Sequence, residues 1–222
     1  MTISPFMSQS RSGRYIDFAN PHPDQFTIED IAFGLARECR FNGQTSMYYS
    51  VATHSVLVSL VVPKEYALIA LMHDGSEAFM RDICTPLKRL IPDYRKIEDQ
   101  MQQAIYASVG LTDVTDDLYK VIKAADERMF LTENAQLMTH HRTDFPGIQQ
   151  TEPYPIKIRE LGDKEACFYF LDRYVSIIND TPFVKERDLW QAQQNEFIQR
   201  AGQTEYLGHN GSSATRQHPK AA

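Results

Sequence analysis

An apolar segment that ends in four ionisable residues constrains this chain more than any other part of it. The run Tyr66–Met72 is almost wholly apolar, which predicts a buried helix. His73 and Asp74 follow at once, and Glu77 and Asp82 complete a group of four within ten residues. A buried charge needs a partner because its desolvation is costly. A divalent metal would supply that partner, whereas the simpler alternative is a core histidine hydrogen-bonded to a neighbouring acid.

The composition favours one helical domain and argues against several classes of partner. The chain has 222 residues and a net charge of -6, which disfavours binding to a nucleic-acid polymer because that requires concentrated Lys and Arg. Cys39, Cys84 and Cys167 show no paired spacing, so we expect free thiols in a reducing compartment. No segment approaches the ~20 apolar residues that span a membrane. Residues 1–13 lack the apolar core of a signal peptide, and a cytoplasmic protein without a membrane partner is expected.

Composition also divides the chain into three parts. We expect a flexible N-terminus over residues 1–13, one all-α domain over residues 14–205 and a disordered tail over residues 206–222. The first part of the domain, residues 14–26, is expected to be extended with a short strand. Residues after 138 are assigned to packing or to assembly of a homo-oligomer.

Cap residues and apolar periodicity predict the helices of this domain. Thr27 caps a helix that ends near Cys39, and Ser50 caps one that ends before Pro63. Thr85 is the expected N-cap of a short helix. The other helices are expected over residues 92–110, 116–138, 163–179 and 182–200. In the helix over 163–179, the residues assigned to the core are Phe168, Phe170, Leu171, Tyr174 and Ile178.

Two more ionisable side chains interrupt apolar helix faces. His54 lies early in an apolar helix, and the two helices joined at Pro63 are expected to pack antiparallel. That packing brings His54 near His73 and Asp74. Asp126 stands beside the apolar stripe of the helix over 116–138, where an acid is costly unless it is paired or metal-bound. A salt bridge and a metal ligand are equally open for Asp126.

Basic residues near this group suggest an anionic ligand. Arg40 begins a loop that is expected to face the site, because binding residues are commonly carried by loops. Lys88 and Arg89 lie on the short helix that starts near Thr85, and a helix N-terminus beside cations is a phosphate receiver. The alternative is two solvated surface charges, which we favour for Arg89.

In this order, His54, the His73-Asp74 pair and Asp126 resemble the ligand set of the HD-domain metal-dependent phosphohydrolases. Those are all-helical proteins whose metal is held by a His, an adjacent His-Asp pair and a distant Asp. The extension to Glu77 and the segment 82–88 is similar to the 5′-deoxynucleotidase branch. It is also similar to phage-encoded HD proteins, some of which hydrolyse deoxynucleoside triphosphates. The resemblance covers roughly residues 14–138.

The resemblance implies an HD-domain helical bundle with a metal site between core helices. The implied metal ligands are His54, His73, Asp74 and Asp126. The implied catalytic acids are Glu77 and Asp82. The implied substrate contacts are Arg40, Phe41 and Lys88. A mixed imidazole and carboxylate set suits one divalent transition metal, Mn, Co, Zn, Fe or Ni, better than Ca.

Two residues depart from the pattern of the deoxynucleotidases. Cys84 stands where that loop usually has proline, which changes the expected rigidity of the loop. Phe41 stands where those enzymes typically carry tryptophan, so packing against the base or sugar is expected to differ.

The expected reaction is hydrolysis of a deoxynucleoside monophosphate to the deoxynucleoside and phosphate. The alternative, release of triphosphate from a deoxynucleoside triphosphate, needs the same metal, water and cationic clamps. A non-catalytic nucleotide-binding module would predict a broken ligand set, yet all four ligands and both acids are present. A purely structural helical protein gives no reason to place these groups together on apolar helix faces.

Overall fold

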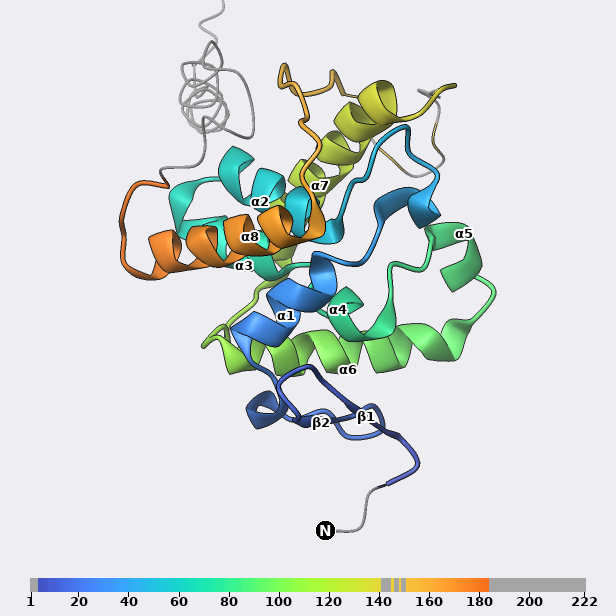
Figure 1. Ribbon diagram of the computed structural model, residues 1–222, viewed down its shortest axis with the longest axis vertical. Helices are drawn as coiled ribbons and strands as arrows, with labels where there is room; N and C mark the ends of the chain where they lie inside the picture. The colour runs from blue at the N-terminus through green and yellow to red at the C-terminus, as the bar shows by residue number, and fades with distance from the viewer. Residues whose placement is uncertain (1–3, 141–144, 146–147, 149–150, 184–222) are drawn as a thin grey trace, which may run out of the picture.

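Helix α2 (Val51–Val61) runs through the middle of the molecule, and every residue from Val51 to Leu60 is buried. The computed structural model describes residues 4–140, 145, 148 and 151–183 (Figure 1). Helix α2 packs against α3, α7 and α8. A helix that is apolar all round belongs in a core, and here that core helix carries His54.

The described chain is mostly helical, as the sequence predicted. The other helices are α1 (Ile28–Leu35), α3 (Ala67–Met72), α4 (Glu77–Met80), α5 (Thr85–Lys88), α6 (Pro92–Ser108), α7 (Asp116–Leu137) and α8 (Asp163–Ile178). Short 3-10 helices occupy Pro23–Gln25, Arg40–Gly43 and Lys64–Tyr66. Within the described residues, no helix is long and apolar enough to cross a membrane.

Side-chain caps confirm two of the predicted helix starts. The Thr27 hydroxyl accepts a hydrogen bond from the backbone N–H of Asp30 at the start of α1. The Ser50 hydroxyl does the same for Thr53 at the start of α2. Helix α5 differs slightly, because it begins at Thr85 with Cys84 as its N-cap.

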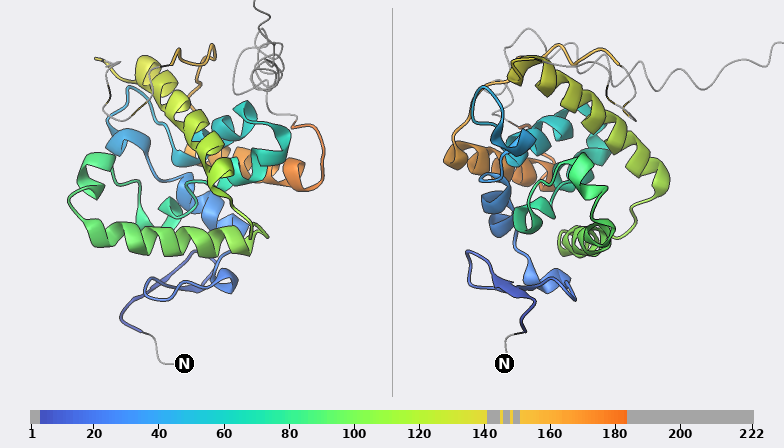
Figure 2. Two further views of the ribbon diagram at one scale, coloured as in Figure 1. Left: turned by 180° about the vertical axis from the view of Figure 1, so that it is seen from behind. Right: turned by 90° about the vertical axis from the view of Figure 1, so that its right-hand side faces the viewer.

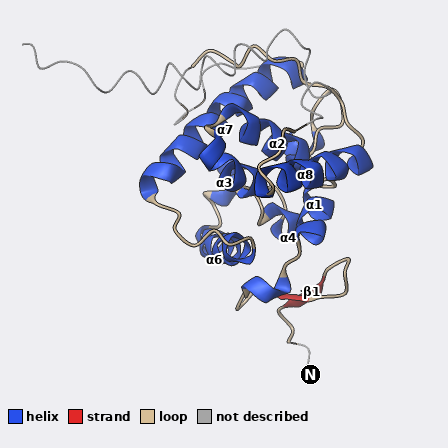
Figure 3. Ribbon diagram, turned by 90° about the vertical axis from the view of Figure 1, so that its left-hand side faces the viewer, coloured by secondary structure: helices blue, strands red, loops and turns tan. Residues whose placement is uncertain are grey.

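The N-terminal segment is more ordered than the sequence predicted. Strand β1 (Met7–Gln9) pairs antiparallel with β2 (Tyr15–Asp17), and this hairpin lies at one end of the helical body (Figures 2 and 3). The hydroxyl of Ser10 and the backbone N–H of Ser12 both donate to the Asp30 carboxylate in α1. Residues 7–13 are therefore part of the fold. The polar composition concealed this because a side chain distant in sequence supplies the partner.

The buried helix predicted over the apolar run that ends at Met72 is confirmed as α3, but it does not continue to Glu77. Helix α3 ends at Met72, a turn follows, and α4 begins at Glu77. Gln102 of α6 replaces the helical hydrogen bonds, donating to the Met72 carbonyl at 2.7 Å and accepting from the Ser76 N–H at 2.9 Å. A Cβ at Gly75 would approach the Ile105 side chain of α6 to 2.8 Å. Close packing against α6 thus overrides local helix propensity at this turn.

Helix α8 covers α2 and α1, which confirms a packing role for the chain after residue 138. Phe170 is fully buried as predicted, but Phe168 and Ile178 are each 52% exposed, so their assignment to the core was wrong. Apolar composition alone does not say which face of a helix meets the core. The helix predicted over 182–200 and the tail over 206–222 lie almost entirely outside the described residues.

Candidate metal centre

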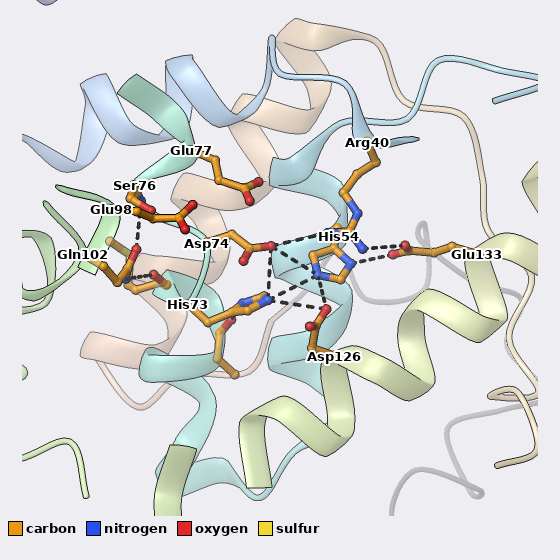
Figure 4. Close-up of polar contacts among 12 residues, drawn as sticks. Arg40, His54, His73, Asp74, Ser76, Glu77, Glu98, Gln102, Asp126 and Glu133 are labelled. Atoms are coloured by element: carbon orange, nitrogen blue, oxygen red, sulfur yellow. Dashed lines mark hydrogen bonds and ion pairs between the residues drawn. The ribbon is translucent and has the colours of Figure 1, made fainter. Parts of the chain in front are cut away.

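Four side chains from three parts of the fold converge in the interior. His54 comes from the first turn of α2, His73 and Asp74 from the turn after α3, and Asp126 from α7. Figure 4 shows their polar atoms directed toward one another. The antiparallel packing predicted for the helices that flank Pro63 is consistent with this, since α2 and α3 are in contact.

The distances among these groups are short. The two Nε2 atoms of His54 and His73 lie 3.3 Å apart. Asp74 Oδ2 lies 3.2 Å from His73 Nε2 and 3.5 Å from His54 Nε2. Asp126 Oδ1 lies 3.1 Å from His54 Nε2 and 3.8 Å from His73 Nε2. His54, His73 and Asp74 together form a group that could hold a metal ion, and Asp126 is placed to extend it.

The outer nitrogens of both imidazoles are already engaged. His54 Nδ1 lies 2.5 Å from Glu133 Oε1, and His73 Nδ1 lies 2.7 Å from the Ala70 carbonyl oxygen. Since both partners can only accept, each Nδ1 donates and each Nε2 of a neutral ring keeps its lone pair. Asp74 Oδ2 is buried and has no hydrogen-bond partner among the described residues. Four atoms with lone pairs facing one common point fit a bound cation.

The electrostatics of the metal-free protein favour positive charge at this point. Burial opposes the charged form of His73, yet the neighbouring Asp74 carboxylate holds the pKa of His73 well above its usual range. Burial would likewise raise the pKa of Asp74, but the charge of His73 lowers it to about 2. The pKa of Asp126 is lowered well below its usual range, because hydrogen bonds from both histidines outweigh its burial. Protons and a metal therefore compete for the same place.

Two acids and a lysine face the group from α4, the loop after it and α5. Glu77 is buried, and its Oε2 has no hydrogen-bond partner among the described residues. Burial, together with the charges of Asp74 and Asp82, raises the pKa of Glu77 well above its usual range. Burial also raises the pKa of Asp82. Lys88 Nζ lies 2.6 Å from Glu98 Oε1 and 3.7 Å from Glu77 Oε1.

Arg40 reaches the group from the opposite side. Its Nη2 donates to Glu133 Oε2 at 3.0 Å, and its Nη1 lies 3.5 Å from Asp74 Oδ2. Its buried Nε has no partner among the described residues. Arg40 opens a turn in which Phe41 and Asn42 have φ of 54° and 51°. Non-glycine residues in this left-handed region are strained, and such strain concentrates at functional sites.

A cavity of about 620 Å³ joins these elements, within the size range of small-molecule sites. One side is aromatic: the rings of Phe41 and Phe130 stack with centroids 5.3 Å apart, and Phe145 meets Phe130 edge-on at 4.8 Å. The other lining residues used below are Arg40, Asp74, Glu77, Asp82, Lys88, Arg89, Arg95, Lys123 and Asp126. All the predicted site residues except His54 and His73 therefore line one cavity. Those two histidines contact Asp74, which is one of the lining residues.

The sequence analysis missed Glu133, which is fully buried behind His54. It lies seven residues after Asp126 on α7, two helical turns further on. That spacing was the available signal, because it places a second acid on the face that carries Asp126. Gln102 and Phe130 were also missed, and nothing in the sequence set them apart.

Comparison with known proteins identifies relatives of this chain. It is 38% identical over 166 residues to "Uncharacterized protein YfdR" of Escherichia coli (strain K12), a match that covers 73% of this chain and 90% of that protein. The chain belongs to the YfdR family. It is also 35% identical over 162 residues to "Uncharacterized protein RCAP_rcc00048" of Rhodobacter capsulatus, a match that covers 68% of this chain and 82% of that relative. No model of a known protein family matches the chain.

Proposed function

We propose that this protein is a metal-dependent phosphohydrolase of the HD-domain type that acts on deoxynucleotide phosphates. Its preferred reaction is hydrolysis of a deoxynucleoside monophosphate to the deoxynucleoside and phosphate. The observation that carries the proposal is the convergence of His54, His73, Asp74 and Asp126 beside a cavity with cationic and aromatic walls. The resemblance of these residues to the HD-domain phosphohydrolases adds to it.

The four converging side chains would hold one divalent transition metal, Mn, Co, Zn, Fe or Ni. When bound, such a metal offsets charge on a phosphoryl group and lowers the pKa of water. Asp74 is suited to this role because its Oδ2 is buried without a hydrogen-bond partner among the described residues. His54 and His73 are suited because their outer nitrogens are fixed by other bonds.

The cationic groups of the cavity bind and orient the phosphate. Arg40 Nε is a buried donor that no described residue uses, so it is free to donate to a phosphate oxygen. Lys88 contributes a positive charge near Glu77. The ring of Phe41, stacked on Phe130, offers an apolar surface for the base or sugar.

Glu77 is placed to move the proton. Burial raises its pKa well above the usual range, so its carboxyl group is protonated at a higher pH than an exposed glutamate. In this step water attacks phosphorus, the bond from phosphorus to the deoxynucleoside oxygen breaks, and protonated Glu77 donates its proton to that oxygen. The proton that the attacking water gives up then restores the Glu77 carboxyl group. Asp82 raises the proton affinity of Glu77 by its nearby negative charge.

Release of triphosphate from a deoxynucleoside triphosphate is the second candidate. Arg89, Arg95 and Lys123 line the same cavity in addition to Arg40 and Lys88. These cations exceed what a single phosphate requires, which favours a longer phosphate chain.

The test is a panel of dNMPs, dNTPs and the matching ribonucleotides, incubated with added Mn or Co and analysed for inorganic phosphate, pyrophosphate and triphosphate. Chelator and the Asp74→Ala variant serve as controls. Phosphate released from dNMPs supports the first candidate, and triphosphate released from dNTPs supports the second. A protein that binds metal yet hydrolyses no member of the panel would show that the assigned substrate class is wrong.

A further inference from the structure

We infer that Glu133 is a positioning residue that orients His54 and Arg40 together, so that one carboxylate links metal affinity to phosphate binding. This inference rests on the proposed metal-dependent function. Glu133 touches neither the cavity nor the point where the metal ligands converge, and it acts only through the two side chains that it holds (Figure 4).

The carboxylate of Glu133 is fully buried and receives three hydrogen bonds. Its Oε1 accepts from His54 Nδ1 at 2.5 Å and from the Tyr49 hydroxyl at 2.7 Å. Its Oε2 accepts from Arg40 Nη2 at 3.0 Å. The three donors come from different parts of the chain. His54 lies on α2, Tyr49 precedes the N-cap residue of α2, and Arg40 lies in the turn after α1. A buried carboxylate with this many donors is rigidly held.

The first consequence concerns His54. Because Nδ1 donates to Glu133, the tautomer that remains presents the lone pair of Nε2 toward His73, Asp74 and Asp126. A carboxylate behind a ligand histidine also raises its basicity and fixes the plane of its ring. His73 is different, since its Nδ1 bonds only to the Ala70 carbonyl. The two histidines are thus unequal, and His54 depends more on its outer partner.

The second consequence concerns Arg40. Glu133 holds Nη2 and Asp74 lies near Nη1, which leaves Nε as a donor that no described residue uses. The strained turn at Phe41 and Asn42 sets the backbone of Arg40, while Glu133 sets its guanidinium group. A planar guanidinium held at one edge can bind an anion only in a limited range of orientations. Loss of Glu133 therefore releases a metal ligand and a phosphate clamp at the same time.

A purely structural ion pair would make a different prediction. It would lower the stability of the protein when removed, but it would leave metal affinity and spectrum unchanged once the protein was folded. Thr132 supplies a matched control, because it is equally buried and lies next to Glu133 on α7. Its hydroxyl donates to the Arg128 carbonyl and accepts from the Tyr154 N–H, and no hydrogen bond joins it to a described residue of the site.

The experiment compares wild type, Glu133→Gln, Glu133→Asp and Thr132→Val. Calorimetry with Mn²⁺ gives metal affinity, the visible absorption bands of bound Co²⁺ report ligand geometry, and dNMP kinetics at saturating Mn²⁺ separate KM from kcat. For Glu133→Gln we expect metal affinity to fall about 10–100-fold, the Co²⁺ bands to shift, and KM to rise by a larger factor than kcat falls. Glu133→Asp keeps the charge and should lie between wild type and Glu133→Gln. Thr132→Val should bind metal as wild type does.

The outcomes separate this inference from the proposed function. Wild-type protein that binds no metal would overturn both. Wild-type protein that binds metal, with Glu133→Gln equal to it in affinity and Co²⁺ spectrum, would overturn the inference alone. The inference also fails if Thr132→Val loses as much affinity as Glu133→Gln, because helix stability would then explain the effect. If Glu133→Gln does not fold, wild-type affinity in Glu133→Asp overturns the inference and reduced affinity supports it.

Discussion

The two sides of the site hold carboxyl groups whose pKa values are shifted in opposite directions. On the ligand wall, formed by α2, the turn after α3 and α7, Asp126 and Glu133 have lowered pKa values, because their bonds to His54 and neighbouring cations outweigh burial. On the acid wall, formed by α4 and the loop after it, burial raises the pKa values of Glu77 and Asp82. Helices α2 and α7 of the ligand wall have 11 and 22 residues, whereas helix α4 has four.

This difference teaches how one residue type takes two roles in one cavity. A carboxylate that accepts several hydrogen bonds stays charged and attracts a cation. A carboxyl group that is buried beside other acids keeps its proton to a higher pH and can deliver it. The ligand wall therefore suits the binding of a metal, and the acid wall suits proton transfer.

The largest effect is expected from Asp126→Ala on the ligand wall. The change removes a carboxylate that lies 3.1 Å from His54 Nε2, and metal binding should fall below detection by calorimetry. Activity should fall roughly 10³-fold or more, since the metal supplies several kcal/mol of transition-state stabilisation. Metal analysis of the purified variant that showed full occupancy would contradict Asp126 as a ligand.

Glu77→Gln should damage the acid wall alone. The variant keeps the shape of the side chain but has no proton to donate, so turnover should fall about 10²–10⁴-fold. Metal affinity should remain near that of wild type, because Glu77 is not among the converging ligands. In wild type, kcat/KM should decline as pH rises through the raised pKa of Glu77. Full turnover in Glu77→Gln would remove it from the mechanism.

The walls should also respond to pH with opposite signs in chelated protein. The folded pKa of Asp74 is about 2 against 3.8 unfolded, so its stabilisation is present above pH 4 and is lost as pH falls toward 2. The folded pKa of Glu77 is raised, so its contribution is present below the unfolded pKa and is lost as pH rises.

Urea unfolding of wild type, Asp74→Asn and Glu77→Gln over a range of pH measures these contributions. The stability difference between wild type and Asp74→Asn should shrink in acid. The stability of Glu77→Gln relative to wild type should increase as pH rises above about 4.5, the ordinary glutamate pKa. Parallel curves of stability against pH for all three proteins would refute the opposite pKa shifts of Asp74 and Glu77.

Gly34→Ala should disturb the acid wall through packing. A Cβ at Gly34 would lie 2.5 Å from the Ala78 carbonyl oxygen, so α1 and α4 must move apart. Overpacking of this kind lowers the free energy of unfolding by about 1–3 kcal/mol, which urea unfolding measures. Turnover should fall, and metal affinity should remain that of wild type. The control is Gly162→Ala, where the added Cβ meets nothing within 4 Å, and the weaker N-cap should cost no more than about 1 kcal/mol.

Arg89→Ala should have the smallest effect. Arg89 is exposed, and no described residue forms an ion pair with it. The KM for a monophosphate should change by less than about 5-fold, because exposed charge pairs contribute no more than about 1 kcal/mol. A much larger rise in KM for a triphosphate than for a monophosphate would favour the second candidate reaction.

Local patterns were sufficient to predict most helices, and they singled out the four side chains that the structure brings together. Ser50 and Thr27 are caps that act within one turn, and the structure confirms both. His54, His73, Asp74 and Asp126 stood out because ionisable groups are rare on apolar helix faces. The approach of His54 to His73 and Asp74 followed from the short connection at Pro63, whereas the place of Asp126 in the group was implied only by the resemblance to the HD-domain proteins.

The features that could not be predicted from the sequence depend on contacts between residues far apart in the chain. The break after Met72 is held by Gln102, and the N-terminal hairpin is held by Asp30, so neither could be inferred from its own segment. Glu133 resembles a surface glutamate until Arg40 and Tyr49 are placed around it. Residues that support a site carry weaker sequence signals than residues that form it, because any helix position can host them.

The hydrogen bond between His54 and Glu133 also has a consequence for synthesis of the chain. Its two residues are 79 positions apart, and a ribosome adds about 5–20 residues per second. For roughly 4–16 seconds the nascent chain therefore contains His54, on a helix that is almost wholly buried in the folded protein, without its carboxylate partner. Helix α2 cannot reach its final burial in that interval, so the stretch that carries the first ligand is exposed to chaperones until α7 has emerged.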